Sequence, residues 1–572
     1  MKYPAVLVRD VARNHSAIEE RQLHLPSRAA LELSILILAV VAAAVPFINQ
    51  PFHMDDNFYI DMARNVLQKP LFPYDSPYVF EGILVSDMGS HSHPPFQAYF
   101  LAGILFLFGE GEGRECIYHA CALVFPIICV AAFYLLAAKF LRKPLWPALL
   151  LAFSPLFLVM QHNLMTDVPN LAFWLSGIAA FVWAEEAGNK KAYLVSSIFL
   201  TAALFTSYQS LSLPLLLGFY HLRKRNNAFG WLALLAPVVL LAMWFTANCI
   251  HYDRFLLADT AKYVQSRNGW DPGRLATKFA AIIQYQGWLV IFPILLPYVF
   301  ARGLARRCLV LASLIIAYAV WLAIPQYSLS NKVILIAGSI AGLAIVLEMG
   351  SQVITRKSQM ATDVKWRTTE RQFLYLWYFG VIAYCLLLFS DGSARYLLPL
   401  VPPMLMLFCH KCEVFARKAG VTVLYAAVVL SGSAGLALSH ADLEFASIYP
   451  RIARDSRRIT GGMASYYGGE WGFRYYMAKA NFRQLTAGTD GLSSSNWLVR
   501  PALALPYRLD RSSLARTILV REIAYGVKTP LRLLDRHSPA GFYSTHWGIL
   551  PFSISWEDQE VIDIRQFKTR AR

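Results

Sequence analysis

The chain of 572 residues is 56% hydrophobic and only 16% charged, with a mean hydropathy of +0.42. This composition excludes disordered, fibrous and ordinary soluble proteins. A net charge of +17 in a soluble protein indicates a nucleic-acid partner, whereas in a membrane protein it can arise from basic cytoplasmic loops. The positions of the charges along the chain therefore decide which partner they indicate.

The first 28 residues are polar and basic, and they precede an apolar run over 29–48 that lacks a small-residue cleavage pattern. We predict a cytoplasmic N-terminal segment over 1–28 and a retained first membrane helix, not a signal peptide. Apolar runs near spanning length predict about thirteen transmembrane helices in all. They lie at 29–48, 117–138, 144–163, 168–185, 192–207, 210–222, 228–250, 286–301, 307–325, 332–350, 372–390, 395–410 and 420–438.

A further apolar stretch, 96–108, is short for a span and follows a polar, proline-containing segment. We predict an interfacial helix on the outer side of the membrane. If it spanned, every later loop would change sides. With thirteen spans, the basic loops lie in the cytoplasm and the loops between them carry almost no charge, so the positive-inside rule sets the orientation.

This topology leaves three segments outside the cytoplasmic membrane. They are a first outer loop (49–116), a second large outer loop (251–285) and a C-terminal tail (440–572). We therefore predict a transmembrane domain over 29–439 and a small periplasmic α/β domain over 440–572, in a multi-pass protein of the bacterial inner membrane. Any chemistry is expected in the outer segments.

Acidic residues begin two predicted helices on the outer side. Asp55 and Asp56 open an amphipathic segment, and Asp167 lies two residues before Pro169. Helix capping by itself explains such carboxylates. A carboxylate at the outer membrane face can instead deprotonate an acceptor hydroxyl. The convergence of both sites with Arg395 on one membrane face favours the catalytic interpretation.

Three cations on the outer side are candidates for binding an anionic substrate. Arg395 begins a proline-interrupted membrane helix, where the positive-inside bias disfavours a cation and where an arginine can hold a phosphate through two hydrogen bonds. Arg254 and Lys262 lie in the second outer loop and are candidates for a clamp on a lipid-like anionic donor. A solvated charged face is the alternative for these two.

His91 and His93 alternate in the first outer loop. With a carboxylate from elsewhere they are candidate ligands of a divalent metal ion. Solvated or hydrogen-bonded histidines are the alternative, because the pattern by itself supplies no further ligands. A divalent metal ion is the only cofactor that the sequence suggests.

Four motifs occur in order between residues 29 and 410. They are Asp55-Asp56 with Tyr59 and Arg64, His93-Pro94-Pro95, Thr166-Asp167-Val168-Pro169, and Arg395-Tyr396-Leu397-Leu398-Pro399. Together they resemble glycosyltransferase family 39, which includes bacterial protein O-mannosyltransferases and lipid A aminoarabinose transferases of the membrane-embedded GT-C fold. The resemblance implies that Asp55 takes the position linked to catalysis and that Asp167 is the acidic residue of the next outer loop. It also makes Tyr59, Arg64, His93 and Tyr396 candidate substrate-binding residues.

We therefore predict an α-helical GT-C membrane glycosyltransferase of the cell envelope. It would move a hexose or pentose, with inversion, from a polyprenyl-phosphate donor to an acceptor protein, lipid or polysaccharide outside the cytoplasmic membrane. Asp55 would act as the base, and Asp56 and Asp167 would position the acceptor or a metal. Arg395, with Lys332, would neutralise the departing phosphate.

Two alternatives belong to other functional classes. A transporter or flippase of lipid-linked glycans predicts charged residues paired near the middle of the membrane, and the predicted spans are nearly free of them. A non-catalytic glycan-assembly protein predicts that activity survives the loss of both acidic outer sites. A nucleic-acid partner is not expected under any of these hypotheses.

Overall fold

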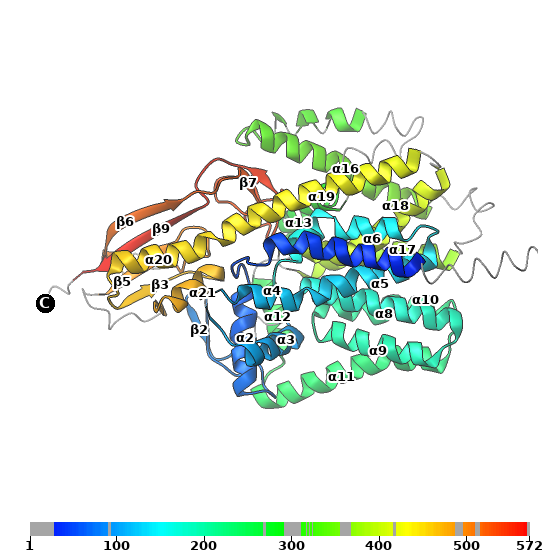
Figure 1. The fold of residues 1–572 in the computed structure, drawn as a ribbon, viewed down its shortest axis with the longest axis horizontal. Coiled ribbons are helices and arrows are strands. Elements are labelled where there is room, and N and C mark those ends of the chain that lie inside the picture. The colour runs from blue at the N-terminus through cyan, green and yellow to red at the C-terminus, as the bar shows by residue number, and fades with distance from the viewer. Residues whose placement is uncertain are drawn as a thin grey trace, which may run out of the picture.

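The computed structural model is largely helical, with a small sheet at one end (Figure 1). It describes residues 28–89, 93–111, 113–266, 270–290, 311–315, 317–319, 321–322, 324–354, 368–389, 391–415, 419–486, 496–508 and 515–568. The predicted metal ligand His91, most of the predicted span 286–301 and part of the predicted span 307–325 lie outside these residues.

Seven helices in the described part of the chain are long and apolar enough to cross a membrane. All seven coincide with predicted spans, which confirms an α-helical polytopic membrane protein, while the total of thirteen spans stays a prediction. They are Arg28–Phe47, α4 with α5 (Glu115–Ala122 and Val124–Phe140), α8 (Asp167–Ala187), α11 (Ala228–Tyr252), α16 (Leu329–Ile354), α17 (Thr368–Leu388) and α19 (Ala419–Ala446), which α20 (Ile448–Thr460) follows.

Other predicted spans form shorter helices. The stretch 144–163 is divided into α6 (Leu145–Ala152) and α7 (Pro155–Met160), because the Ser154 hydroxyl accepts a hydrogen bond from the Phe157 N–H and Pro155 begins a new helix. The remaining ones are α9 (Lys190–Leu204), η3 with α10 (Tyr208–Leu211 and Ser212–Leu222) and η5 with α18 (Arg395–Leu400 and Val401–Phe415).

The first outer loop contains α2 (Asp56–Gln68), the hairpin of β1 (Tyr78–Phe80) and β2 (Ile83–Val85), and α3 (Phe96–Phe108). The helix α3 has 13 residues, in agreement with the predicted helix over 96–108. The second outer loop is helical, since it forms α12 (Leu256–Ser266) and α13 (Pro272–Leu289). The Asp271 carboxylate caps α13 by accepting hydrogen bonds from the N–H groups of Gly273 and Arg274.

A small domain with a mixed five-stranded sheet follows α19 and α20, as predicted. The sheet order is β4-β3-β5-β9-β6, and β9 pairs antiparallel with both β5 and β6. The boundary predicted at 439/440 falls inside α19, which continues to Ala446. The elements of this domain are β3 (Ser465–Tyr467), α21 (Trp471–Lys479), β4 (Arg483–Gln484), β5 (Trp497–Pro501), β6 (Thr517–Tyr525), β7 (Leu531–Arg532), β8 (Ser553–Ile554) and β9 (Glu560–Phe567).

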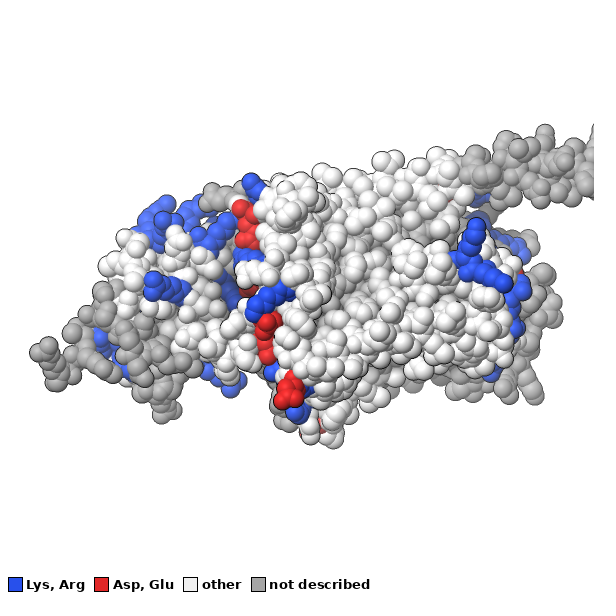
Figure 2. All heavy atoms as spheres, turned by 90° about the horizontal axis from the view of Figure 1, so that it is seen from below, with Lys and Arg blue, Asp and Glu red and all other residues white. Residues whose placement is uncertain are grey.

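Charged side chains lie at the two ends of the molecule. Figure 2 shows an almost uncharged middle, with Lys and Arg gathered at one end and side chains of both signs at the junction with the C-terminal domain. An uncharged middle of this kind is what a bilayer requires of the surface that crosses it.

Candidate functional site

Arg395 lies between two carboxylates that are distant in the sequence. Its Nη1 is 3.1 Å from Asp55 Oδ2 and 3.9 Å from Asp167 Oδ2. The side chains of Arg395 and Asp167 are 12% and 13% exposed, whereas that of Asp55 is 42% exposed. A nearly buried cation needs neighbouring carboxylates. The structure therefore brings together three of the five residues that we predicted to carry the chemistry, without Asp56 and Lys332.

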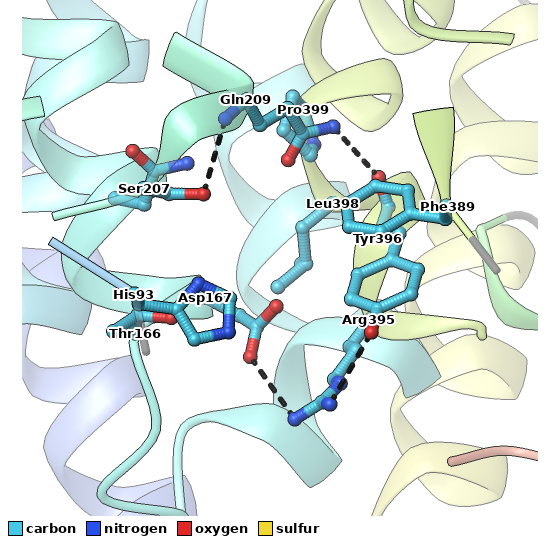
Figure 3. A pocket seen from close by; sticks show the side chains of 11 residues that line it. His93, Thr166, Asp167, Ser207, Gln209, Phe389, Arg395, Tyr396, Leu398 and Pro399 are labelled. Atoms are coloured by element: carbon cyan, nitrogen blue, oxygen red, sulfur yellow. Dashed lines mark hydrogen bonds and ion pairs between the residues drawn. The ribbon is translucent and has the colours of Figure 1, made fainter. Parts of the chain in front are cut away.

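A pocket lies beside this trio (Figure 3). Arg395 and Asp167 line it, and Asp55 does not. The free space in the pocket holds about one water-sized group, so a larger ligand must displace some of the lining side chains. The lining residues are His93, Thr166, Asp167, Asn170, Ser207, Gln209, Phe389, Arg395, Tyr396, Leu398 and Pro399.

Uncharged polar side chains form one wall of the pocket, and the sequence analysis missed them. Asn170 Oδ1 accepts a hydrogen bond from Ser210 Oγ at 2.6 Å, and Ser207 Oγ accepts from the Gln209 N–H at 3.3 Å. Gln209 Nε2 donates to the Tyr396 carbonyl at 3.2 Å. These bonds fix the side chains and leave the Ser207 hydroxyl hydrogen, the Asn170 amide nitrogen and Gln209 Oε1 for a ligand. Asn170 lies in the first turn of α8, and Ser207 and Gln209 lie at the start of η3, so no single motif in the sequence marks this wall.

Aromatic rings form another wall. Tyr396 stacks on Phe389 with ring centroids 3.7 Å apart and planes at 4°. The Arg395 guanidinium carbon lies 5.2 Å from the Tyr396 ring centroid, and Nη2 donates to the Tyr396 hydroxyl at 3.4 Å. The ring therefore helps to hold the guanidinium beside the pocket, and Tyr396 is at the site as predicted.

Asp56 is fully buried. Its carboxylate accepts hydrogen bonds from the N–H of His53 at 2.9 Å and from the N–H of Leu164 at 2.8 Å. Burial raises the Asp56 pKa to about 7, although both hydrogen bonds oppose the shift. Asp56 therefore fastens the start of α2 to the segment before α8, and it does not line the pocket. Tyr59, also buried, places its hydroxyl 3.5 Å from Thr166 Oγ1 across the same junction.

His93 lines the pocket, and its backbone carbonyl accepts a hydrogen bond from the Tyr74 hydroxyl at 2.7 Å. Burial and the positive charge of Arg395 lower the His93 pKa to about 4, so the imidazole is neutral near pH 7. A neutral imidazole is able to bind a ligand or a metal. The described residues contain no group of three or more His, Cys, Asp or Glu side chains placed to hold a metal ion, so the metal stays a prediction.

Two predicted substrate-binding cations have partners elsewhere. Arg64 forms ion pairs with Asp61 on its own helix and with Glu110, at 2.7 Å in the second case. The Lys332 ammonium lies over the Trp321 ring, 4.6 Å from its centroid. Neither side chain lines the pocket. Each instead interacts with an anion or an aromatic ring elsewhere.

The two candidates in the second outer loop are also away from the pocket. Arg254 pairs with Asp87 and, at 3.0 Å, with Asp259. Lys262 is 76% exposed and lies 3.6 Å from the same Asp259. Asp259 belongs to α12 and Asp87 to the first outer loop. Both cations therefore have a carboxylate partner close to their own position in the fold. Arg395 is the predicted substrate-binding cation that lines the pocket.

Comparison with known families agrees with the resemblance seen in the motifs. Residues 92–250 match the family model of dolichyl-phosphate-mannose-protein mannosyltransferases. The match includes His93, Asp167 and the polar wall, while Asp55 and Arg395 lie outside it. The match agrees with the predicted glycosyltransferase family over this stretch, which is less than a third of the chain. No curated protein sequence matches the chain.

Several solved structures have a similar arrangement. The Archaeoglobus fulgidus oligosaccharyltransferase AglB, in complex with an inhibitory peptide and a dolichol-phosphate, is 12% identical with a TM-score of 0.47, over 82% of this chain and 65% of that chain. ArnT from Cupriavidus metallidurans, bound to undecaprenyl phosphate, is 13% identical with a TM-score of 0.42, over 94% and 98%. The mycobacterial arabinofuranosyltransferase AftD is 12% identical with a TM-score of 0.42, over 96% and 40%. The chain thus spans less than two thirds of the length of the oligosaccharyltransferase chain.

Proposed function

We propose that the protein is a glycosyltransferase that moves a sugar from a polyprenyl-phosphate carrier to an acceptor on the outer side of the cytoplasmic membrane. The observation that carries this proposal is the arrangement of Asp55, Asp167 and Arg395 beside one pocket. The matched family, named for a dolichyl-phosphate-mannose donor, supports a lipid-phosphate sugar as the substrate class.

Arg395 is the group that receives the phosphate. A polyprenyl-phosphate sugar carries its negative charge on the phosphate, and that charge grows as the bond to the anomeric carbon breaks. A guanidinium can hold the departing phosphate through two parallel hydrogen bonds. Arg395 is suited to this role because it lines the pocket and its Nε has no hydrogen-bond partner.

Asp55 is the general base. Its side chain is the most exposed of the three, so an acceptor can approach it from outside the pocket. Asp55 takes the proton from the acceptor hydroxyl while that oxygen attacks the anomeric carbon. The bond from the anomeric carbon to the phosphate oxygen breaks, and its electron pair leaves with the phosphate on Arg395. Attack opposite to the leaving group inverts the configuration of the anomeric carbon.

The pocket binds the sugar of the donor. Asp167 accepts a hydrogen bond from one sugar hydroxyl, and Asn170, Ser207 and Gln209 supply neutral donors and acceptors for others. The stacked rings of Phe389 and Tyr396 close the apolar side. This mixture of polar groups and aromatic rings suits the hydroxyls and the apolar face of a sugar residue.

The positions of the basic loops support an outer location for the site. Lys190, Lys191 and the run Arg223–Arg225 follow the carboxyl ends of α8 and α10, whereas Asp167 begins α8 at its other end. Because basic loops stay in the cytoplasm, the site faces the outer side and the N-terminus lies inside. A lipid carrier presents its head group at such a face.

Sugar transfer by the purified full-length protein tests this proposal. Synthetic polyprenyl-phosphate donors with a hexose or a pentose are supplied with envelope extract, and release of polyprenyl phosphate is measured. We expect Asp55→Asn to lower kcat by about 10²-fold to 10⁴-fold, as loss of a general base does. Asp75→Asn is the control, since Asp75 is partly exposed, pairs with Lys69 at 2.8 Å and does not line the pocket.

Two outcomes contradict the proposal. Full activity of Asp55→Asn removes Asp55 as the base. Absence of transfer by the wild type from every donor, together with movement of a labelled lipid-linked sugar across vesicles, identifies a flippase instead.

A further inference from the structure

The C-terminal domain contacts the chain on both sides of the Asp55–Arg395 pair. One contact, the Asp55-side contact, joins Trp471, Gly472 and Tyr476 of α21 to residues 52–57. The other, the Arg395-side contact, joins residues 542–545 to residues 392–394. The two partners of the ion pair thus have the same domain as a neighbour.

The Asp55-side contact brings two backbones together. A Cβ on Gly472 would lie 2.2 Å from the Phe52 carbonyl oxygen, so glycine alone permits this approach. The Phe52 N–H donates to the Tyr476 hydroxyl at 3.1 Å, and that hydroxyl donates to Glu115 at 3.0 Å. The N–H and the carbonyl group of Phe52 are therefore both in contact with α21.

The turn that carries Asp55 is held in an unusual conformation. Met54 and Trp471 have φ values of +46° and +61°, a region that L residues with side chains rarely adopt. Asn57 joins them, because in the amide orientation that suits its neighbours its nitrogen donates to Met54 O at 3.0 Å and to Trp471 O at 3.2 Å. Such a conformation persists only where the surroundings fix it. Here the first residue of α21 is part of what fixes the residue before Asp55.

The Arg395-side contact consists of reciprocal hydrogen bonds. Gly392 N–H donates to Thr545 Oγ1 at 2.9 Å, and Thr545 N–H donates to Gly392 O at 2.8 Å. Ala394 N–H and the Ser393 hydroxyl both donate to Phe542 O, at 2.9 and 3.2 Å. The three residues before Arg395 are therefore fixed by the C-terminal domain.

Tyr543 connects the two contacts through a buried polar cluster. Its hydroxyl donates to Asp442 at 2.9 Å, and the other oxygen of Asp442 lies 3.3 Å from His53 Nε2. His53 is the residue whose N–H binds Asp56. His53, Asp442 and Tyr543 therefore form one buried cluster that lies against both contacts.

We propose that the C-terminal domain positions the catalytic pair, with Gly472 setting the place of Asp55 and Thr545 setting the place of Arg395. This inference rests on the proposed function, and it differs from a purely stabilising role in one respect. Because the two contacts hold different backbone segments, one next to Asp55 and one next to Arg395, disturbing each should change a different quantity: kcat for the first and phosphate binding for the second.

The first test is Gly472→Ala, which forces a Cβ against Phe52. We expect kcat to fall about tenfold or more, since a displacement of the base near 1 Å is costly, while the donor KM stays within about twofold. Gly380→Ala in α17 is the matched control, because a Cβ there meets no atom within 4 Å.

The second test is Thr545→Val, which removes the hydroxyl that accepts from Gly392 at similar volume. We expect binding of polyprenyl phosphate, without sugar, to weaken about tenfold, since the misplaced Arg395 holds the phosphate less well. Thr545→Ser retains the hydroxyl and should bind as the wild type does. This binding assay needs no turnover, so it decides the inference even if the wild type transfers no sugar and the proposed function fails.

Two results overturn the inference. In one, both variants keep wild-type kcat, KM and binding. In the other, kcat and phosphate binding fall together in each variant, and both fall in proportion to the loss of folded protein measured by thermal unfolding. That result would mean that the contacts only stabilise the fold.

Discussion

Arg395 Nη1 lies 3.1 Å from Asp55 Oδ2, although 340 positions separate the two residues. This ion pair joins the proposed base to the proposed phosphate-binding group in the absence of substrate. Under the proposed function, a donor phosphate on Arg395 would compete with Asp55 for the same guanidinium and would free the carboxylate for the acceptor. We therefore expect the donor to bind before the acceptor.

Arg395→Lys should separate charge from geometry at the site. Lysine keeps the positive charge but lacks the planar pair of donors that matches a phosphate. We expect kcat/KM for the donor to fall about 10-fold to 100-fold, and Arg395→Ala to lose more. Steady-state release of polyprenyl phosphate measures both. Lysine that restores full activity would show that charge alone is required.

Asp56→Asn should act on stability more than on chemistry. Each oxygen of the buried Asp56 carboxylate accepts a backbone N–H, and an asparagine must turn its NH2 group toward one of them. We expect the free energy of unfolding to fall by about 1–3 kcal/mol. Unfolding in detergent compares it with Asp55→Asn, which should unfold like the wild type because Asp55 is partly exposed. If Asp56→Asn is as stable as the wild type, the hydrogen bonds of Asp56 do not stabilise the junction between α2 and the segment before α8.

Gln209→Ala should affect the sugar and spare the lipid phosphate. The Gln209 side chain lines the pocket and bonds the Tyr396 carbonyl, away from the charged groups. Loss of one neutral hydrogen bond to a sugar hydroxyl costs about 0.5–1.5 kcal/mol, so the donor KM should rise about twofold to tenfold. Binding of polyprenyl phosphate without sugar is the control and should stay unchanged. If that binding weakens as much as the donor KM rises, Gln209 does not contact the sugar.

Glu470 should make the stability of the C-terminal domain depend on pH. Burial raises the pKa of this carboxyl to about 7, against the opposing effects of Arg474 and the Glu81 N–H. The folded state therefore holds the proton more tightly than the unfolded state, and stability is highest below the ordinary pKa near 4.5 and falls as pH rises toward 7.

Glu470→Gln removes this titration and serves as the reference. The wild-type free energy of unfolding minus that of the variant should fall by up to about 3 kcal/mol between pH 4.5 and 7.5, because each unit of pKa shift corresponds to about 1.4 kcal/mol. Other titrating groups cancel in this difference. Denaturant unfolding at several pH values measures it, and a difference that is flat or rises with pH would refute the assignment.

Local sequence patterns were sufficient for the membrane architecture and for the acidic residues. Hydropathy and charge are properties of short windows, so the seven long helices, the basic loops and the helix starts at Asp55 and Asp167 were predictable without tertiary contacts.

Tertiary structure decided which charges remain for a substrate. In the sequence, Arg64, Arg254 and Arg395 are all candidate substrate-binding cations. Packing shows that each has a carboxylate partner and that, of the three, Arg395 alone lines the pocket. The neutral wall of Asn170, Ser207 and Gln209 carries no charge or motif to mark it. The contact of Gly472 with Phe52 joins segments more than 400 positions apart. The sequence by itself determined the membrane helices and the kinds of side chain at their ends. Long-range packing determined which of these side chains form ion pairs, because an ion pair depends on distances that local hydropathy does not encode.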